Sequence, residues 1–320
     1  MWKAFDNLLP LQNDYESGAI YRSCAMSFYF KRKESVGKAV RRLCGERLDG
    51  ALELIENAAR FDAIHNVRRE IKKLRAVLRL IRADIGNEIY YERTNALREA
   101  AQRLTALRDA QVKLSAFSGL AKHLNGRPAP SLPKIKAALR ENCRAEEKRV
   151  FKGGSVTSIK EILCHEKQQF ENLKLRSNGW KAIEPGLKKI YRQGREAFEA
   201  AEREPSPENF HEWRKRIKDL AHQLRLLSRA RPRKLHARTG DLDKLGDLLG
   251  GDHDLLLLKE FVSDKFGHAP DVKPLEKLIS SRQEKLRSAA LKLGARFYPG
   301  KPKRFCRKIG GYWKSWKHQD

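Results

Sequence analysis

Apolar residues recur along most of this chain at intervals of three, four and seven positions, which is the spacing of one face of an α-helix. Few segments alternate between apolar and polar positions as a half-buried strand does. In the stretch from residue 34 to residue 60, the helical spacing is carried by Val36, Val40, Leu43, Leu52, Ile55 and Ala59. The pattern therefore predicts an all-α protein.

The breaks in this pattern predict where the helices end. Residues 125–130 and 152–155 are rich in glycine and proline, and residues 177–179 form the best boundary between two halves. Asp62 and Ser206 are suitable N-caps, and Pro207 suits a first helical turn. We expect helices over residues 34–60, 62–86, 88–124 (one long helix or two short ones), 134–150, 155–175, 180–203, 207–230, 233–266, 271–296 and 302–317. This gives a first unit over 34–176 and a second over 180–318, after an unassigned lead-in over 1–33.

One basic helical pattern occurs in both halves. The first copy begins at His65 and the second at His211, and each is followed by arginine and lysine at helical intervals. At about 100° per residue, the cations of the first copy fall with its histidine inside an arc of roughly 80°. We call His65, Arg68, Lys72, Arg75 and Arg79 the first ridge, and His211, Arg214, Lys218 and Arg225 the second ridge.

Apolar residues occupy the opposite side of both helices. In the first they are Val67, Ile71, Leu74, Val77, Leu78 and Ile81, and in the second Trp213, Ile217, Leu220, Leu224 and Leu227. Each helix is therefore expected to bury one face and to present a basic ridge, about 20 Å long in the first copy at 1.5 Å per residue. Like charges four residues apart destabilise an isolated helix slightly, so a solvated face would normally intersperse acids.

The overall charge agrees with the ridges. Lysine and arginine total 68 and aspartate and glutamate total 40, which gives a formal net charge of +28. Such an excess causes self-repulsion and indicates a polyanionic partner or surface, without choosing among nucleic acid, anionic lipid and polymeric phosphate.

An aspartate follows each ridge at a matching distance. Asp109 comes 44 residues after His65, and Asp254 comes 43 residues after His211. Either carboxylate could orient a ridge arginine through a charge-assisted hydrogen bond. The helices that precede the ridges are basic as well, so packing beside the ridge helices would turn the cationic surface into a groove.

Other features narrow the class. No apolar run approaches the roughly 20 residues that span a bilayer, and the first residues lack the pattern of a secretory signal. The five cysteines are scattered without a C-x-x-C pair, which favours reduced thiols, a cytoplasmic location and no zinc site. We expect no cofactor.

The ordered set of motifs resembles the CHAD family, the conserved histidine α-helical domain. The matching segments begin at His65 and Phe210 and include Leu107–Ala110, Leu249–Asp254, Gly186–Arg195 and the closing 301–313, so that the resemblance covers roughly residues 34–318. It implies two four-helix bundles related by pseudo-twofold symmetry with a basic groove between them. It also implies a non-catalytic module that binds inorganic polyphosphate and associates with polyphosphate granules.

The sequence departs from the family pattern in the second half. Ala221 stands where Arg75 stands in the first copy, His222 replaces a common aromatic residue, and His253 stands where Arg108 does. We therefore expect the second ridge to be weaker at its middle.

Two other functions remain open. Nucleic-acid binding suits the charge equally, but the ridges lack interleaved aromatic residues for base stacking. A phosphate or metal enzyme that uses the histidines would need an acidic metal cluster or a phosphate-binding glycine loop. Only the aspartates from 241 to 254 could form such a cluster, and their leucine spacing reads as an amphipathic helix.

The interpretation yields one set of candidate binding residues, all of them basic, and no catalytic or metal-binding residue. Those that precede or belong to the first ridge helix are Lys38, Arg41, Arg42, His65, Arg68, Arg69, Lys72, Lys73, Arg75 and Arg79. Those that precede or belong to the second are Lys188, Lys189, Arg192, Arg195, His211, Arg214, Lys215, Lys218 and Arg225.

Overall fold

The computed structural model describes residues 28–57, 60–121, 131–267 and 269–318. These residues contain α-helices and one short 3-10 helix, η1 (Ser228–Ala230), and no strand, so the predicted all-α class is confirmed. The α-helices are α2 (Val36–Asn57), α3 (Arg60–Ile85), α4 (Asn87–Gln102), α5 (Thr105–Ala121), α6 (Leu132–Lys152), α7 (Ser155–Glu171), α8 (Trp180–Arg203), α9 (Pro207–Leu226), α10 (Pro232–Phe266), α11 (Lys273–Phe297) and α12 (Pro302–Lys317).

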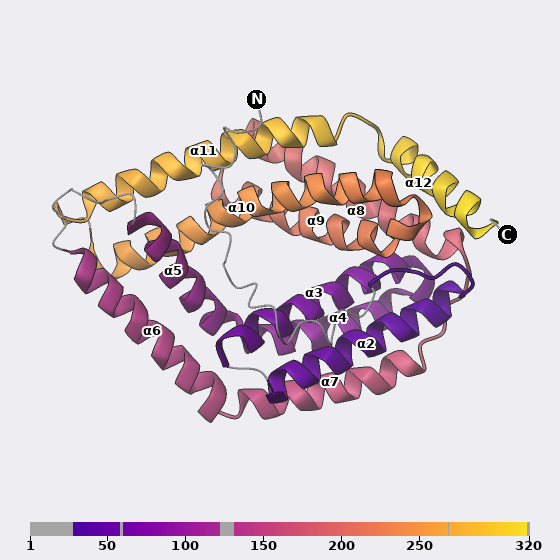
Figure 1. Cartoon of the computed structure of the whole chain (residues 1–320), viewed down its shortest axis with the longest axis horizontal. Coiled ribbons are helices and arrows are strands. Elements are labelled where there is room, and N and C mark those ends of the chain that lie inside the picture. The colour runs from indigo at the N-terminus through magenta and orange to yellow at the C-terminus, as the bar shows by residue number, and fades with distance from the viewer. Residues whose placement is uncertain (1–27, 58–59, 122–130, 268, 319–320) are drawn as a thin grey trace.

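The helices form two packed groups that meet at α3 (Figure 1). In the first group, α3 packs against α2 and α4, and α7 packs against the same two helices, which makes a four-helix arrangement. In the second group, α9 packs against α8 and α10, while α11 covers α10 and α12 covers α8. Helix α3 contacts both α8 and α9, so the two ridge helices touch across the centre of the molecule. The pseudo-twofold relation and the proposed unit boundaries stay predictions.

The hairpin of α5 and α6 leaves the first group and reaches the second. Helix α5 packs against α6 on one side and against α10 on the other. Figure 1 shows α5 running between the ends of α3 and α10. This crossing brings residues that follow the first ridge helix next to residues from the second half.

Local differences from the sequence-based expectation concern helix ends. Asp62 lies inside α3, which already begins at Arg60, so it is not the N-cap. For the stretch from 88 to 124, the structure has the second of the two expected alternatives, two helices, α4 and α5. Ser206 does cap α9, because its side chain accepts a hydrogen bond from the Asn209 amide. Residues 1–27 of the lead-in and the expected loop over 125–130 lie outside the described residues.

The predicted apolar faces of the two ridge helices form much of the core. On α3, Val67, Ile71 and Leu74 expose none of their surface to water, and on α9 the same holds for Trp213 and Ile217. Burial of such side chains stabilises the fold by about 1.5–3 kcal/mol each. The opposite, basic faces are therefore fixed in direction, because rotation of either helix would expose this core.

Gly186 sets how closely the second half approaches α3. A Cβ atom at this position of α8 would lie 2.0 Å from the carbonyl oxygen of Leu80 on α3. Real Cβ atoms do not approach a backbone oxygen so closely, so only glycine allows this contact. The glycine thereby holds the two groups of helices, and their ridges, at short range.

The last helix ties down the start of the described chain. The ammonium of Lys317 on α12 donates hydrogen bonds to the backbone carbonyls of Lys31, Arg32 and Glu34. The Phe30 ring also packs edge-on against Trp313, with 5.4 Å between the ring centroids. We call this contact the terminal latch.

Candidate functional site

The two ridges meet around Lys72. This residue lies on α3, and its ammonium is repelled by cations from its own helix, from α5 and from α9. Burial first, and then this repulsion, lowers the pKa of Lys72 from 10.5 to about 7. The cations that act on it are Arg214, Arg68, Lys218 and Arg108. The basic faces predicted from separate halves of the sequence therefore converge.

The shape of this region is concave. Lys72 and His65 are both exposed to water, yet surrounding protein is the largest cause that lowers the pKa of each. A side chain can reach water and still have protein on most sides only when it lies in a hollow. We infer that the converging ridges line a hollow, which we call the central groove, between α3 and α5 on one side and α9 and α10 on the other.

Helix α10 leaves room for the second ridge. Gly246 faces the Lys218 side chain, and a Cβ atom there would lie 2.8 Å from its Nζ. One turn further on, the Cβ position of Gly250 lies 3.7 Å from Arg214 Nε. The two glycines, four residues apart on one helix face, let both cations lie against the backbone of α10.

Asp254 and Asp109 act on the ridges through charge at longer range. The pKa of Asp254 is raised by burial, against opposing effects from Arg214, Arg108 and Lys72. Arg68 does not use Asp109 as a hydrogen-bond acceptor in the part of the chain that the structure describes. Its Nη1 donates instead to the Ala101 carbonyl and to Thr105 Oγ1. Arg68 therefore donates to acceptors at the end of α4 and the start of α5 in place of the expected Asp109 carboxylate.

Three histidines lie close to the ridge cations. His211 on α9 faces His253 on α10, with 4.5 Å between the ring centroids. Burial, then Arg214, lowers the pKa of His253 to about 4, and burial, then Arg108, lowers that of His65 to about 3. All three rings are therefore neutral near pH 7, because burial and then nearby lysine also lower the pKa of His211.

Three polar atoms around the second ridge are buried without a hydrogen bond. His211 Nδ1, His253 Nδ1 and Arg214 Nε have no partner among the residues that the structure describes. Such atoms are rare in proteins because an unpaired buried polar group costs about 1–3 kcal/mol. The second ridge therefore has unused hydrogen-bonding capacity beside its histidine pair.

Carboxylates from the second half reach several ridge cations. Arg79 pairs with Asp219 on α9, with 3.0 Å between Nη1 and Oδ1. Lys218 lies 3.5 Å from Asp247 on α10, and Arg225 pairs with Asp243. Sequence reasoning treated the ridges as almost free of acids, which holds along each helix but not across the fold. These acids offset part of the ridge charge, and cations still outnumber carboxylates around Lys72.

The predicted residues of α2 point to other partners. Arg41 donates to the Leu173 carbonyl after α7, and Arg42 forms ion pairs with Glu34 and Glu46. On α3, Glu70 binds Lys73 and approaches Arg69. Lys38 is exposed. Apart from Lys38, these cations already have protein partners.

The predicted residues of α8 lie on its exposed side. Arg192 and Arg195 form i,i+4 ion pairs with glutamates on the same helix, and Lys215 on α9 forms an i,i+3 ion pair with Glu212. Lys188 is exposed. Burial, then Arg82, lowers the pKa of Lys189, which places it beside the end of α3 rather than beside Lys72.

Arg108 is a groove residue that the sequence-based set omits. It is among the cations that act on His65, Lys72, Arg68 and Asp254. Its position on α5 becomes relevant only because α5 crosses to α10. One feature of the sequence could have identified Arg108: it occupies the position in the first half that His253 occupies in the second half.

The described residues contain neither a metal-binding cluster nor a helix that could span a membrane. No three histidine, cysteine, aspartate or glutamate side chains gather closely enough there to hold a metal ion. No described helix has the length and apolar character needed to cross a lipid bilayer.

Comparisons with known proteins agree with this architecture. The family model described as "CHAD domain" matches residues 39–263. The crystal structure of the CHAD domain from the plant Ricinus communis is similar over 90% of this chain and 95% of that chain, with a TM-score of 0.54 and 15% sequence identity. At that identity the likeness shows the fold alone. No curated protein gives a significant match.

Proposed function

The chain belongs to the CHAD domain family, and on this premise we propose that its central groove binds inorganic polyphosphate. The observation that carries the proposal is the ring of cations around Lys72, contributed by α3, α5 and α9. Repulsion among these cations is relieved when an anion enters, so binding energy is available without any rearrangement of the fold.

The chemistry of the groove suits a chain of phosphates. Polyphosphate presents a negative charge at every unit and no base or side chain to be read. Arginine offers forked contacts to phosphate oxygens, and lysine offers a point charge. Arg68, Arg108 and Arg214 provide the first kind of contact, and Lys72 and Lys218 provide the second. The neutral histidines can add hydrogen bonds at the wall.

We propose a binding module rather than an enzyme. The groove combines cations with neutral imidazoles, and the nearby carboxylates of Asp109 and Asp254 lie among arginines rather than in a cluster of their own. On such a surface the arginine and lysine side chains would contact phosphate directly. Phosphoryl-transfer enzymes instead use carboxylates to hold a metal ion beside the phosphate. Association with polyphosphate granules is the cellular role that we propose for it.

The test is a charge-reversal variant with a matched control. Replacement of Arg68, Lys72 and Arg214 by glutamate should abolish binding of long-chain polyphosphate in a titration, while circular dichroism keeps its helical signal. The control reverses Lys136, Arg140 and Arg144, three exposed cations spaced by four residues on α6, and changes the net charge equally. Equal losses in both variants would show that overall charge, and not the groove, determines binding.

Competition separates polyphosphate from nucleic acid. If the groove is built for a thin phosphate chain, polyphosphate should displace labelled single-stranded DNA at equal phosphate concentration, and DNA should displace polyphosphate poorly. Affinity should fall steeply with salt because bound phosphates release counterions. Preferential retention of DNA would favour the nucleic-acid function instead.

A further inference from the structure

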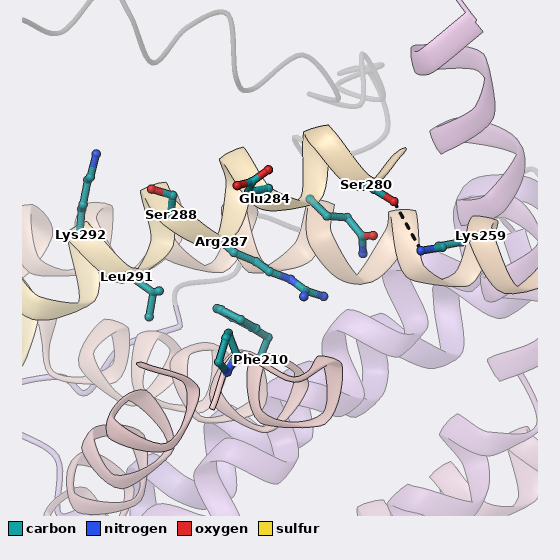
Figure 2. A pocket seen from close by; sticks show the side chains of 10 residues that line it. Phe210, Lys259, Ser280, Glu284, Arg287, Ser288, Leu291 and Lys292 are labelled. Carbon is teal, nitrogen blue, oxygen red and sulfur yellow. Dashed lines mark hydrogen bonds between the residues drawn. The ribbon is translucent and has the colours of Figure 1, made fainter. Parts of the chain in front are cut away.

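A second pocket lies outside the central groove, between α11, α10 and the start of α9 (Figure 2). It has a volume of about 650 Å³, within the roughly 300–1,000 Å³ typical of small-molecule sites. Its lining includes Phe210, Lys259, Ser280, Gln283, Arg287 and Leu291. None of these belongs to either ridge.

The floor of this pocket is rigid. Arg287 Nε donates to the buried carboxylate of Asp252, at 2.7 Å. Its guanidinium also lies over the Phe210 ring, 4.9 Å from the ring centroid, and Figure 2 shows it directed from α11 toward Phe210. Gln283, itself buried, donates to the Asp252 backbone carbonyl. A flat cation is thus fixed on an aromatic ring.

The two ends of the pocket differ in chemistry. At one end, Lys259 on α10 donates to Ser280 on α11, which places an ammonium and a hydroxyl together (Figure 2). At the other end, Leu291 and Phe210 supply apolar surface beside Arg287. Ser280 and Arg287 are seven residues apart on α11, or about 10 Å along the helix at 1.5 Å per residue.

We propose that this pocket binds a nucleoside phosphate. A planar base stacks on the guanidinium of Arg287, which is held flat by Asp252 and Phe210, since arginine planes and bases stack favourably. The phosphate then reaches Lys259 and Ser280, whose donors suit phosphate oxygens.

The pocket lies next to the central groove. Phe210 precedes His211 in α9, and Asp252 precedes His253 in α10. Phe210, which lines the pocket, and Asp252, which holds Arg287 in place, are therefore adjacent in sequence to the histidine pair of the groove wall. The site is separate from the proposed polyphosphate contacts and does not depend on them.

The experiment is calorimetric titration of the whole protein with AMP, adenosine and orthophosphate. AMP should bind one site with saturation below about 1 mM, and adenosine and orthophosphate should each bind more weakly. Lys259→Ala should weaken AMP about tenfold, as expected for loss of a charge-assisted contact, and leave adenosine unchanged. Arg287→Lys keeps the positive charge but removes the planar guanidinium on which the base stacks, so it should weaken the binding of both AMP and adenosine.

Two controls decide where the nucleotide binds. Lys285→Ala removes an exposed cation on α11 outside the pocket and should change nothing. The groove variant with glutamate at Arg68, Lys72 and Arg214 should bind AMP as the parent protein does. The proposal is overturned if AMP does not saturate, if orthophosphate equals AMP, or if the groove variant loses AMP while Lys259→Ala retains it. None of these results bears on polyphosphate binding.

Discussion

Lys72 should take up a proton when polyphosphate binds. In the free protein the pKa of its ammonium is about 7 because burial and surrounding cations disfavour the charge. A bound phosphate chain replaces repulsion by attraction, so the pKa of Lys72 in the complex must rise. A group whose pKa is higher in the complex strengthens binding fully below its free-state pKa, and this effect declines as the pH rises from the free-state pKa to the bound-state pKa.

The magnitude follows from this value. With a free-state pKa of about 7 and a bound-state pKa well above 8, one group changes the dissociation constant by about tenfold between pH 6 and pH 8. Water in the groove screens the charges, so about tenfold is an upper figure. Near pH 7, each protein molecule that binds polyphosphate should take up about half a proton at Lys72. Near pH 8 this uptake should approach one proton.

The measurement is titration calorimetry at fixed ionic strength in two buffers with different ionisation enthalpies. A long polyphosphate chain is needed because its interior units stay ionised over this range, while only its ends titrate. The control is Lys72→Arg, whose guanidinium stays charged, and it should bind with little proton uptake and a flatter pH profile. The groups that interact with Lys72 from other helices include Arg108, Asp109, Arg214, Lys218, His222, His253 and Asp254.

Two results would refute the reasoning. Equal proton uptake by the parent protein and Lys72→Arg would assign the proton to the histidines. Affinity that does not change between about pH 6 and pH 8 would mean that Lys72 is already charged, and hence that cations do not crowd the groove.

The remaining predictions concern packing and the groove wall. Gly186→Ala should destabilise the protein by about 3 kcal/mol or more in urea unfolding, because the new Cβ meets the Leu80 carbonyl; unchanged stability would mean that the helices are not this close. Gly246→Ala should cost little stability, since it displaces only the flexible end of Lys218, but polyphosphate affinity should fall measurably in a binding titration, and unchanged affinity would remove Lys218 from the site. His211→Ala should weaken polyphosphate binding about threefold, as a neutral hydrogen bond would, and no effect would assign the ring to packing.

Sequence reasoning predicted the helical class and the two ridge helices because both follow from periodicity. The apolar positions of α3, such as Ile71 and Leu74, are as buried as their spacing requires. The opposite positions must then face outward, and this is why Lys72 and Arg214 could be identified as candidates before the fold was known. Their meeting in one groove was an inference from the duplication.

The rest depends on contacts between distant segments. Nothing local in the sequence places Asp219 beside Arg79, or Asp243 beside Arg225. The contribution of Arg108 likewise requires the crossing of α5 to α10. Periodicity fixes which face of a helix is polar, but the neutralisation of that face is decided by tertiary packing.

The terminal latch has a consequence for how the described helices could be reconnected. Because α12 holds the backbone at Lys31 and Glu34, the first described segment lies against the last helix. A short linker between these two segments could therefore close the described helices into a ring, which could be reopened elsewhere, for example at the turn around Gly154. Such a rearranged chain should keep the fold, because the new connection joins segments that already touch.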